Sequence, residues 1–340
     1  MHFLEFVYFI GFSAKKYYSL KNRKSLPFKV VSIGNITSGG TGKTPAVIAI
    51  AEEAKRRGMR PVILTRGYRG RAKGPCFVTK GDGPLLTEPE AGDEPLLMAE
   101  KLKGVPVVKG SDRYESGKFA LGELGNTAAG EGPLLFILDD GFQHFRLARD
   151  KDIVLIDAGN PFGNGMLLPF GRLREPLKSL MRADVIVLTK MEKTAHKRSR
   201  EPDDVIGELR KYNREAPVFL AAHTPVSMRL ASGERRPLDL VSGKRLFAFC
   251  GLGNPGSFKR TIQSLGAELA GYNTYRDHYR YEQPDITRIK KEAGRCGAEW
   301  IVTTEKDIIK LSHLDLPENI LIIEVEFSVE GDFYDQVFSL

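Results

Sequence analysis

A glycine-rich segment, Gly39-Gly40-Thr41-Gly42-Lys43-Thr44-Pro45-Ala46, has the residue types and spacing of a phosphate-binding loop. It follows an apolar, β-branched run at residues 28–33 and precedes a helical pattern at residues 45–57. A glycine-rich turn between a strand and a helix lets backbone N–H groups surround the phosphates of a nucleotide. Lys43 would then reach the β- and γ-phosphates, and the Thr44 hydroxyl would bind Mg²⁺. The segment therefore predicts a binding site for ATP or GTP.

One position departs from the usual pattern G-x-x-x-x-G-K-[ST], because this chain has Thr37 where the first glycine is expected. Glycine-rich turns also serve as plain connections, so Gly-Lys-Thr alone would not decide the matter. The strand pattern before the loop and the helix pattern after it favour nucleotide binding.

Two carboxylates, Asp139 and Asp140, directly follow an apolar run at residues 134–138. A carboxylate at a strand end beside a phosphate loop completes the magnesium site in nucleotide-binding proteins of this kind. Asp-Asp-Gly is also a common turn sequence. The phosphate loop upstream favours the metal interpretation over the turn.

Another strand pattern ends at Thr65-Arg66-Gly67-Tyr68-Arg69-Gly70, which offers two guanidinium groups and a phenol. Arginines at this position could stabilise phosphate charge. An exposed basic loop is an equally good interpretation of the same residues.

Two further residues could move protons. Asp93 precedes Glu94-Pro95, a pattern typical of a helix N-cap. His278 lies in an aromatic and basic stretch at residues 272–281, and histidine is the side chain most easily tuned for proton transfer near neutral pH. Pattern alone favours a capping role for Asp93 and an ordinary packed or exposed histidine at position 278.

The segment Leu188-Thr189-Lys190-Met191-Glu192 resembles the N/T-K-x-D signature that recognises guanine, with Glu192 in place of the discriminating aspartate. It suggests that this strand end lies near the nucleotide base, and it does not decide between GTP and ATP.

The elements that position these residues follow an α/β pattern. Short β-branched runs occur at residues 61–64, 105–108, 134–138, 153–156 and 185–188, with helical stretches such as 94–103 and 113–124 between them. Continuous apolar strands that alternate with helices predict a parallel sheet covered on both faces, with ligands at the carboxyl ends of the strands. The charged stretch at residues 191–215 is typical of a solvated helix, and a second α/β pattern begins near residue 245.

The bulk composition limits the partners. The net charge of +8 and the pI near 9.2 favour a nucleotide, a nucleic acid or an acidic membrane surface. No basic run with interleaved aromatic residues supports nucleic-acid binding. The three cysteines are far apart in sequence and lack C-x-x-C spacing, which argues against disulfides or a zinc site and fits a reducing compartment.

The N-terminal residues 1–14 are apolar and aromatic, and five basic residues follow at positions 15–24. The uncharged run at residues 6–14 is far shorter than a membrane span. The positive charges follow the apolar stretch instead of preceding it, which is unlike a signal peptide. The segment fits either a helix at a membrane interface or a helix packed on the protein's own core.

Taken together, the motifs resemble those of the tetraacyldisaccharide 4′-kinases of lipid A biosynthesis. They occur in the family's order over nearly the whole chain, and the family's own phosphate loop also tends to lack the first glycine. The resembling segments are Ser32-Ile-Gly-Asn-Ile-Thr-Ser-Gly-Gly-Thr-Gly-Lys-Thr-Pro45, Thr65-Arg-Gly-Tyr68, Gly92-Asp-Glu-Pro95, Leu138-Asp-Asp-Gly-Phe-Gln-His144, Asp157-Ala158, Leu168-Pro-Phe-Gly-Arg-Leu-Arg-Glu-Pro176, Thr189-Lys190, Gly251-Leu-Gly-Asn-Pro255, Asp277-His-Tyr279 and Thr303-Thr-Glu-Lys-Asp307.

The resemblance implies a kinase that transfers the γ-phosphoryl group of ATP to the 4′-hydroxyl of a tetraacylated glucosamine disaccharide 1-phosphate, giving lipid IVA. It implies work at the cytoplasmic face of a Gram-negative inner membrane, as a peripheral protein in contact with anionic lipid. With a lipid substrate, the N-terminal segment is expected to be an interfacial helix. Neither a nucleic acid nor a protein partner is expected.

The expected fold is α/β: a P-loop NTPase-like parallel sheet with helices on both faces, a second smaller α/β lobe, and an N-terminal membrane-interface helix. The expected boundaries are residues 1–24 for the helix with its basic flank, 25–220 for the kinase domain and 221–340 for the second lobe.

The resemblance also assigns roles to residues. Asp93 would accept the proton of the sugar hydroxyl, and His278, from the other lobe, would orient Asp93 and tune its basicity. Lys43 would act with them in catalysis, and Arg174 would help to organise phosphate and substrate. The implied nucleotide-binding residues are Thr37, Ser38, Gly39, Gly40, Thr41, Gly42, Lys43, Thr44 and Tyr68. The implied Mg²⁺ ligands are Thr44, Asp139, Asp140 and Glu175.

Two other functions remain as alternatives. A cytosolic GTP-binding switch or metal-insertion GTPase would use the same phosphate loop, with guanine preference, slow hydrolysis and no lipid substrate. A membrane-peripheral adaptor would bind ATP without any phosphoryl acceptor.

Overall fold

The computed structural model describes residues 2–125, 132–189 and 201–339. The chain forms two compact units, of which unit 1 comprises residues 1–223 and 327–340 and unit 2 comprises residues 224–326. Two strands, β8 (Val218–Leu230) and β13 (Ile320–Val329), cross the boundary between the units.

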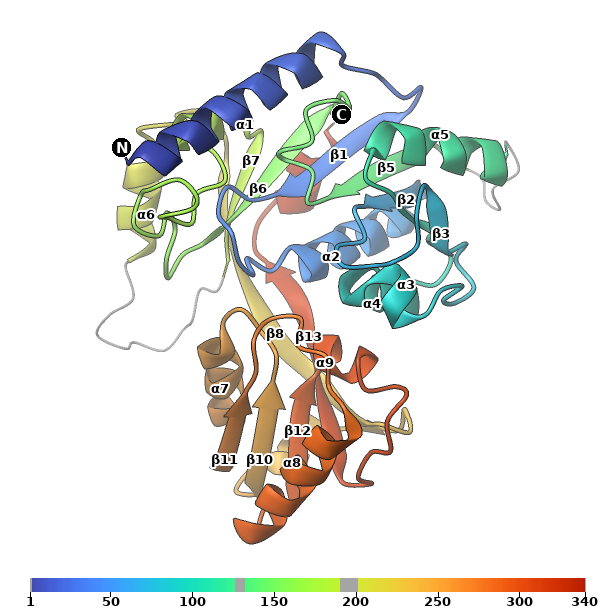
Figure 1. Ribbon diagram of the computed structural model, residues 1–340, viewed down its shortest axis with the longest axis vertical. Helices are drawn as coiled ribbons and strands as arrows, with labels where there is room; N and C mark the ends of the chain where they lie inside the picture. The colour runs from blue at the N-terminus through green and yellow to red at the C-terminus, as the bar shows by residue number, and fades with distance from the viewer. Residues whose placement is uncertain (1, 126–131, 190–200, 340) are drawn as a thin grey trace. The chain divides into compact units, whose positions relative to one another are not determined.

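Unit 1 is built on a largely parallel sheet whose strands follow the order β3-β4-β2-β5-β1-β6-β7-β8 (Figure 1). The edge strand β3 is the exception, because it pairs antiparallel with β4. The register sets Ile33 of β1 opposite Asp139 of β5, so the strand that leads into the glycine-rich loop lies beside the strand that ends in two carboxylates. The other strands of this sheet are β1 (Lys29–Gly34), β2 (Arg60–Thr65), β3 (Cys76–Thr79), β4 (Val107–Lys109), β5 (Leu134–Asp139), β6 (Lys151–Asp157) and β7 (Val185–Thr189).

Helices cover both faces of this sheet, as the apolar strands predict. The α2 helix lies on one face, and α1 and α5 lie on the other (Figure 1). Alternation along the strands explains this arrangement: Val30 and Phe136 belong to the core cluster that includes Ala120 of α5. The helices are α1 (Phe3–Lys21), α2 (Lys43–Arg56), α3 (Glu88–Ala91), α4 (Asp93–Lys101), α5 (Arg113–Leu124), η1 (Leu177–Arg182), α6 (Pro202–Leu209) and α10 (Phe333–Phe338).

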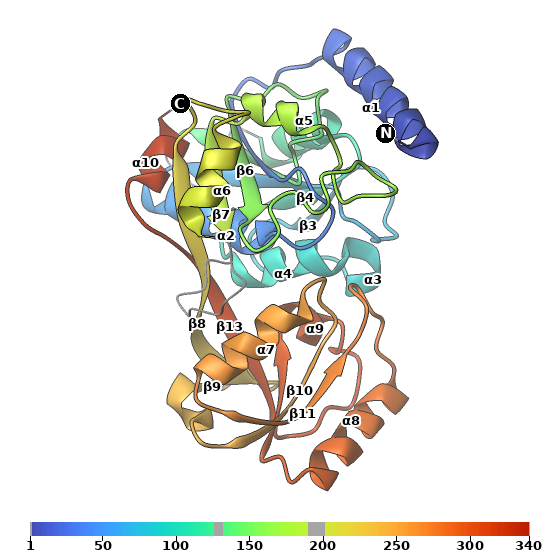
Figure 2. The same cartoon turned by 90° about the vertical axis from the view of Figure 1, so that its left-hand side faces the viewer.

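Unit 2 has its own parallel sheet, in the order β11-β10-β12-β13. Successive residues of β10 face opposite cores: Leu246 and Ala248 pack with Ile262 of α7, whereas Phe247 and Phe249 pack with Ile289 of α8. Figure 2 shows α7 and α8 on the two sides of this sheet. The elements are η2 (Leu238–Val241), β9 (Arg235–Arg236), β10 (Arg245–Cys250), α7 (Pro255–Ser264), β11 (Glu268–Thr274), α8 (Gln283–Arg295), β12 (Trp300–Thr304) and α9 (Glu305–Ile309).

The last residues of the chain pack with unit 1, although the sequence placed residues 221–340 together in a second lobe. Phe333 of α10 is buried, and its ring meets that of Phe219 edge-on at 5.4 Å between centroids. Asp335 pairs with Arg57, the C-cap residue of α2, at 2.6 Å. The apolar side of α10 finds its partners in unit 1, and this long-range packing leaves no local sequence signal.

The N-terminal residues form one continuous helix, α1. In the described part of the chain, no helix combines the length and apolar character that crossing a bilayer requires. Residues 191–200, part of the solvated helix expected at 191–215, lie outside the described residues; α6 follows at Pro202–Leu209.

Candidate functional site

The glycine-rich loop connects β1 to α2 and is held from both sides. Gly42 precedes α2 with φ at +84°, a left-handed conformation that glycine adopts without strain. A Cβ atom at Gly42 would lie 2.3 Å from Cε1 of His223 in β8, so the loop also needs glycine there for space. The Thr189 hydroxyl donates a hydrogen bond to the Thr41 carbonyl at 2.9 Å, and the Asn35 side-chain amide donates one to the Thr41 hydroxyl at 3.1 Å.

The first half of the loop is tied to the segment that precedes Arg174. The N–H of Ser38 donates to the Arg172 carbonyl at 2.6 Å, and Arg172 Nε donates to the Ser38 carbonyl at 3.1 Å. Thr37 forms an isolated bridge with Leu173. These bonds fix the loop while the backbone N–H groups at the start of α2 remain available, which is the arrangement that binds phosphate at a helix N-terminus.

Asp139, the last residue of β5, is buried and only half satisfied by the protein. Its Oδ2 accepts a hydrogen bond from Thr65 at 2.8 Å, whereas its Oδ1 has no hydrogen-bond partner among the described residues. Burial, with the nearby carboxylates of Glu94 and Asp140, raises the pKa of Asp139 to about 6. A buried carboxylate with one open oxygen and an excess of negative charge around it fits a divalent cation as the missing partner.

Asp140, the next residue, has the opposite electrostatic setting. Lys43 Nζ lies 3.5 Å from its Oδ1, and Arg174 Nη1 donates to both carboxylate oxygens at 2.8 and 2.9 Å. Burial alone would raise the pKa of Asp140, but the two cations outweigh it and lower the pKa to about 2. The structure thus brings together three residues that the sequence singled out.

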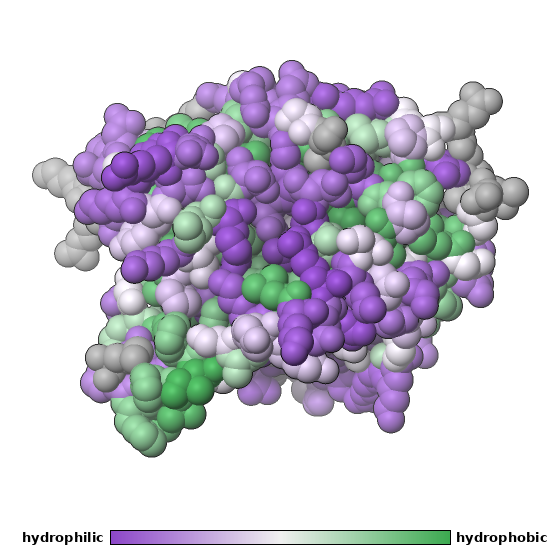
Figure 3. All heavy atoms as spheres, turned by 90° about the horizontal axis from the view of Figure 1, so that it is seen from above, coloured by the Kyte–Doolittle hydropathy of each residue, from purple (hydrophilic) through white to green (hydrophobic). Residues whose placement is uncertain are grey.

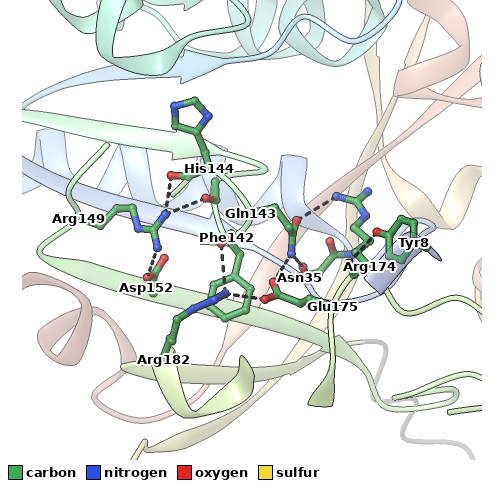
Figure 4. A network of polar contacts seen from close by, with 11 residues as sticks. Tyr8, Asn35, Phe142, Gln143, His144, Arg149, Asp152, Arg174, Glu175 and Arg182 are labelled. Carbon is green, nitrogen blue, oxygen red and sulfur yellow. Dashed lines mark hydrogen bonds and ion pairs between the residues drawn. The ribbon is translucent and has the colours of Figure 1, made fainter. Parts of the chain in front are cut away.

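A buried polar network supports Arg174 from behind (Figure 4). Gln143 Nε2 donates to the carboxylate of Glu175 and to the carbonyl of Asn35, both at 2.7 Å. Glu175 is fully buried and also accepts from Arg182 at 2.9 Å. Arg174 Nη1 is 3.4 Å from Gln143 Oε1. Glu175, a metal ligand in the sequence-based prediction, therefore has both oxygens engaged by protein donors.

Asp93 lies at the beginning of α4, beside the loop that follows β2. It is only 3% exposed, and its Oδ1 accepts a hydrogen bond from the N–H of Glu94 at 3.1 Å. Gly92 precedes it with φ at +92°, and a Cβ there would lie 2.6 Å from the Tyr68 carbonyl oxygen. The glycine thus allows the start of α4 to approach the Thr65–Gly70 segment closely. The Tyr68 ring itself is 53% exposed, with the Arg69 guanidinium 5.6 Å from its centroid.

Arg113 is a site residue that the sequence reasoning missed. It is the first residue of α5 and only 3% exposed, and its Nη2 donates to the carbonyl of Asp139 at 3.3 Å. Its own N–H lies 3.3 Å from Nε2 of His144. Burial and the positive charge of Arg113 lower the pKa of His144 to about 3, so this imidazole is neutral at pH 7. The available signal was position, because Arg113 follows β4 at the same edge of the sheet.

Lys109, the last residue of β4, was also missed. It is 2% exposed and donates to the carbonyl of Glu90, just before Asp93 in the chain. A Cβ at Gly67 would lie 2.6 Å from its Cε atom. Desolvation lowers the pKa of Lys109. This lysine joins the two segments that contain Tyr68 and Asp93.

His278 belongs to unit 2, where Asp277 contacts it and in turn pairs with Lys306. Its backbone has φ at +58°, which is uncommon outside glycine. Asp277 Oδ1 accepts from the His278 N–H at 3.1 Å and from Lys306 Nζ at 3.2 Å. The imidazole Nε2 lies 3.8 Å from Asp277 Oδ2.

The guanine-like signature and the predicted metal site are only partly covered by the described residues and their contacts. Thr189 is described and buried, but the rest of the guanine-like signature, residues 190–192, lies outside the described residues. Within the described ranges, no group of three or more His, Cys, Asp or Glu side chains could hold a metal ion by itself. The three carboxylates of the predicted metal site, Asp139, Asp140 and Glu175, thus do not form one such group.

Comparison with known proteins gives one consistent result. Residues 2–339 match the family model described as tetraacyldisaccharide-1-P 4′-kinase. A tetraacyldisaccharide 4′-kinase of Syntrophus aciditrophicus (strain SB) is 40% identical over 321 residues, 91% of this chain and 83% of that protein. The protein of the same name from Halothermothrix orenii is 39% identical, over 89% of this chain and 81% of its own length.

Among solved structures, LpxK from Aquifex aeolicus, crystallised with ATP, is similar over 98% of this chain and 96% of its own. The TM-score is 0.74 and the sequence identity is 31%.

Proposed function

This chain belongs to the tetraacyldisaccharide-1-P 4′-kinase family, and we propose that it transfers the γ-phosphoryl group of ATP to the 4′-hydroxyl of a tetraacyldisaccharide 1-phosphate, giving lipid IVA. The observation that supports this proposal most strongly is the cluster of Lys43, Asp140 and Arg174 beside the glycine-rich loop. Phosphoryl transfer is mainly a problem of positioning and charge stabilisation, and this cluster offers both.

The nucleotide is held by the loop from Thr37 to Thr44. The N–H groups at the start of α2 bind the phosphate oxygens, and Lys43 reaches the β- and γ-phosphates. The crystal structure of the Aquifex aeolicus protein with ATP supports ATP as the donor. Tyr68, whose exposed ring lies in the loop after β2, contacts the same nucleotide.

Mg²⁺ would fit beside the same loop, with Thr44 and Asp139 as its protein ligands. Both oxygens of Asp140 are engaged by Arg174, so Asp140 would act on the ion from a distance. The open Oδ1 of Asp139 is the observation that favours this assignment. When bound, the ion neutralises charge on the β- and γ-phosphates. Glu175 contributes indirectly, since its contacts with Gln143 and Arg182 hold the network behind Arg174.

Asp93 is the base that accepts the proton of the sugar hydroxyl. Its burial at the start of α4 keeps the carboxylate out of bulk water, which suits a group that must take up a proton. His278 of unit 2 tunes this step, as the family motif Asp277-His278-Tyr279 indicates. A double-mutant cycle on Asp93 and His278 tests whether the two act as one.

The protein works as a peripheral protein at the cytoplasmic face of the inner membrane, with α1 at the lipid surface. Figure 3 shows an apolar patch at the N-terminal end of α1. In the first half of this helix, the apolar side chains between 46% and 78% exposed are Phe3, Leu4, Phe6, Val7 and Ile10. The basic residues at positions 15–24 add attraction to anionic lipid, at about 1 kcal/mol for each lysine or arginine near the surface.

The test is transfer of ³²P from γ-labelled ATP to purified tetraacyldisaccharide 1-phosphate in detergent micelles, with unlabelled GTP as a competitor. We expect labelled lipid that depends on Mg²⁺ and resists GTP. Tight GTP binding without labelled lipid would favour a GTP-dependent switch. ATP binding without any labelled lipid would favour a non-enzymatic adaptor.

A further inference from the structure

The N-terminal helix is bonded directly to the segment that contains Arg174. The hydroxyl of Tyr8 donates to the carbonyl of Arg174 at 2.7 Å (Figure 4). The N–H of Arg174 donates to the carbonyl of Ile36, just before the glycine-rich loop, at 2.8 Å. The peptide groups on both sides of the Arg174 Cα atom are therefore fixed, one by β1 and its loop and the other by α1.

A second anchor holds the beginning of α1 on the same segment. Glu5, only 7% exposed, accepts a hydrogen bond from the N–H of Leu167 at 2.9 Å and one from the N–H of His2 at 3.2 Å. Leu167 in turn bridges Leu173. Burying a carboxylate costs free energy unless hydrogen bonds compensate for the lost water, and both oxygens of Glu5 accept such bonds. The bond from Leu167 to Glu5 fixes the position of α1 along residues 167–174.

The contacts of α1 with its own unit differ from those of a helix that only carries apolar side chains to a lipid surface. Tyr8 and Phe9 pack against the core cluster that contains Ile36 and Phe142. Phe12 meets Phe145 edge-on at 5.9 Å. Phe142 and Phe145 flank the Gln143-His144 pair that follows Asp140, so α1 touches both segments of the Asp140–Arg174 contact.

From these contacts, we infer that Tyr8 is a positioning residue of the phosphoryl-transfer site, which holds the main chain of Arg174 so that its guanidinium group grips both oxygens of Asp140. The inference rests on the proposed function and adds a role for α1 within it. The exposed side of the helix meets lipid, while its buried side sets the geometry of the arginine.

The role is distinguishable from simple anchoring. If Tyr8 only seated the helix, its loss would weaken lipid engagement and raise the KM for the lipid substrate. If Tyr8 acts through Arg174, its loss disturbs charge stabilisation in the reaction and lowers kcat, with the lipid KM unchanged. The loss of one net hydrogen bond corresponds to about a fivefold fall in rate.

The experiment compares wild type, Tyr8→Phe, Arg174→Gln and the double variant for kcat and lipid KM in mixed micelles. Tyr114→Phe, which also removes a tyrosine hydroxyl but from α5, is the matched control. We expect Tyr8→Phe to lower kcat about fivefold at constant KM. In the Arg174→Gln background it should lower kcat by less than about twofold, because the residue it positions is gone. Tyr114→Phe should match wild type.

Hydrogen exchange measured by mass spectrometry on the same full-length proteins gives a readout that does not depend on turnover. Tyr8→Phe should speed exchange in peptides that cover residues 172–176 and leave α2 unchanged. A raised KM with unchanged kcat, additive effects with Arg174→Gln, or unchanged exchange at residues 172–176 would each overturn the inference. If Tyr8→Phe speeds exchange at residues 172–176 but the wild-type protein labels no lipid, the proposed function is rejected and the structural coupling of Tyr8 to Arg174 is retained.

Discussion

Arg174 donates through Nη1 to both carboxylate oxygens of Asp140, while Lys43 approaches the same carboxylate to 3.5 Å. Asp139, one residue earlier, has the opposite environment, with a pKa raised to about 6 by burial and neighbouring carboxylates. The pKa values of these two adjacent aspartates are therefore shifted in opposite directions. Asp140 is ionised by the protein's own cations, and Asp139 has an open oxygen that a cation can satisfy.

The first prediction concerns Lys43. Lys43→Ala removes the cation expected at the β- and γ-phosphates, where charge moves during transfer. We expect kcat to fall by about 10²- to 10³-fold, in line with the loss of one preorganised charge at a reacting group. Turnover in the lipid phosphorylation assay measures this. The melting temperature is the control, and a rate near wild type in a folded Lys43→Ala protein would contradict the role of Lys43.

The second prediction concerns the base. Asp93→Asn preserves the shape of the buried side chain and its bond to the Glu94 N–H but removes the proton acceptor. General-base catalysis contributes about 10²- to 10⁴-fold, so kcat should fall by that amount while ATP binding stays unchanged. Glu88→Gln, which removes a carboxylate from the neighbouring helix α3, is the matched control. Equal kcat values for Asp93→Asn and wild type would exclude Asp93 as the base.

The third prediction concerns the exposed side of α1. Phe6→Ser combined with Ile10→Ser removes two side chains that are 46% and 51% exposed and leaves the Glu5 and Tyr8 contacts in place. Binding to anionic lipid vesicles, measured by sedimentation, should weaken by at least about tenfold, since each buried apolar side chain is worth roughly 1.5–3 kcal/mol.

Leu85→Ser, at another exposed apolar residue of unit 1, controls for general loss of surface hydrophobicity. Vesicle binding that is unaffected by the double substitution would show that α1 does not engage lipid by this side.

The fourth prediction concerns pH. The pKa of His144 is lowered from 6.5 to about 3 in the folded protein, so the neutral imidazole is favoured by folding. The unfolded chain takes up a proton below pH 6.5 that the folded chain refuses until near pH 3. The contribution of His144 to the free energy of unfolding is therefore fully present above pH 6.5. It falls as the pH is lowered toward 3, by up to about 1.4 kcal/mol per pH unit.

His144→Gln keeps an acceptor for the Arg113 N–H but cannot titrate. Denaturant unfolding between pH 4 and 7 should show a shallower loss of stability in His144→Gln than in wild type. Identical pH dependence of the two proteins would contradict the buried, neutral state of His144.

Much of the fold could be predicted from the sequence. The helix expected at residues 113–124 is α5, with the same bounds, and the apolar runs became the parallel strands. The strands β3 and β8 were not anticipated. β3 is a short antiparallel strand at the sheet edge, and β8 interrupts its apolar residues with His223-Thr224-Pro225, so neither shows the continuous pattern of a buried parallel strand.

The candidate site was predictable where chemistry follows strand ends. Lys43 and Asp140 meet because β1 and β5 are parallel neighbours in the sheet. Arg113 and Lys109 were missed because basic residues are usually exposed, and their burial depends on carbonyl acceptors distant in sequence. The partners of Glu175 likewise come from tertiary packing that no local pattern reveals.

The most direct test of the account locates the phosphate. The protein is incubated with ATP, Mg²⁺ and tetraacyldisaccharide 1-phosphate, and the lipid is examined by phosphorus–proton correlation NMR. We predict one new phosphate coupled to the proton at the 4′ carbon, with none formed by Lys43→Ala. ATP consumption with no new lipid phosphate, or a phosphate at another hydroxyl, would contradict the account.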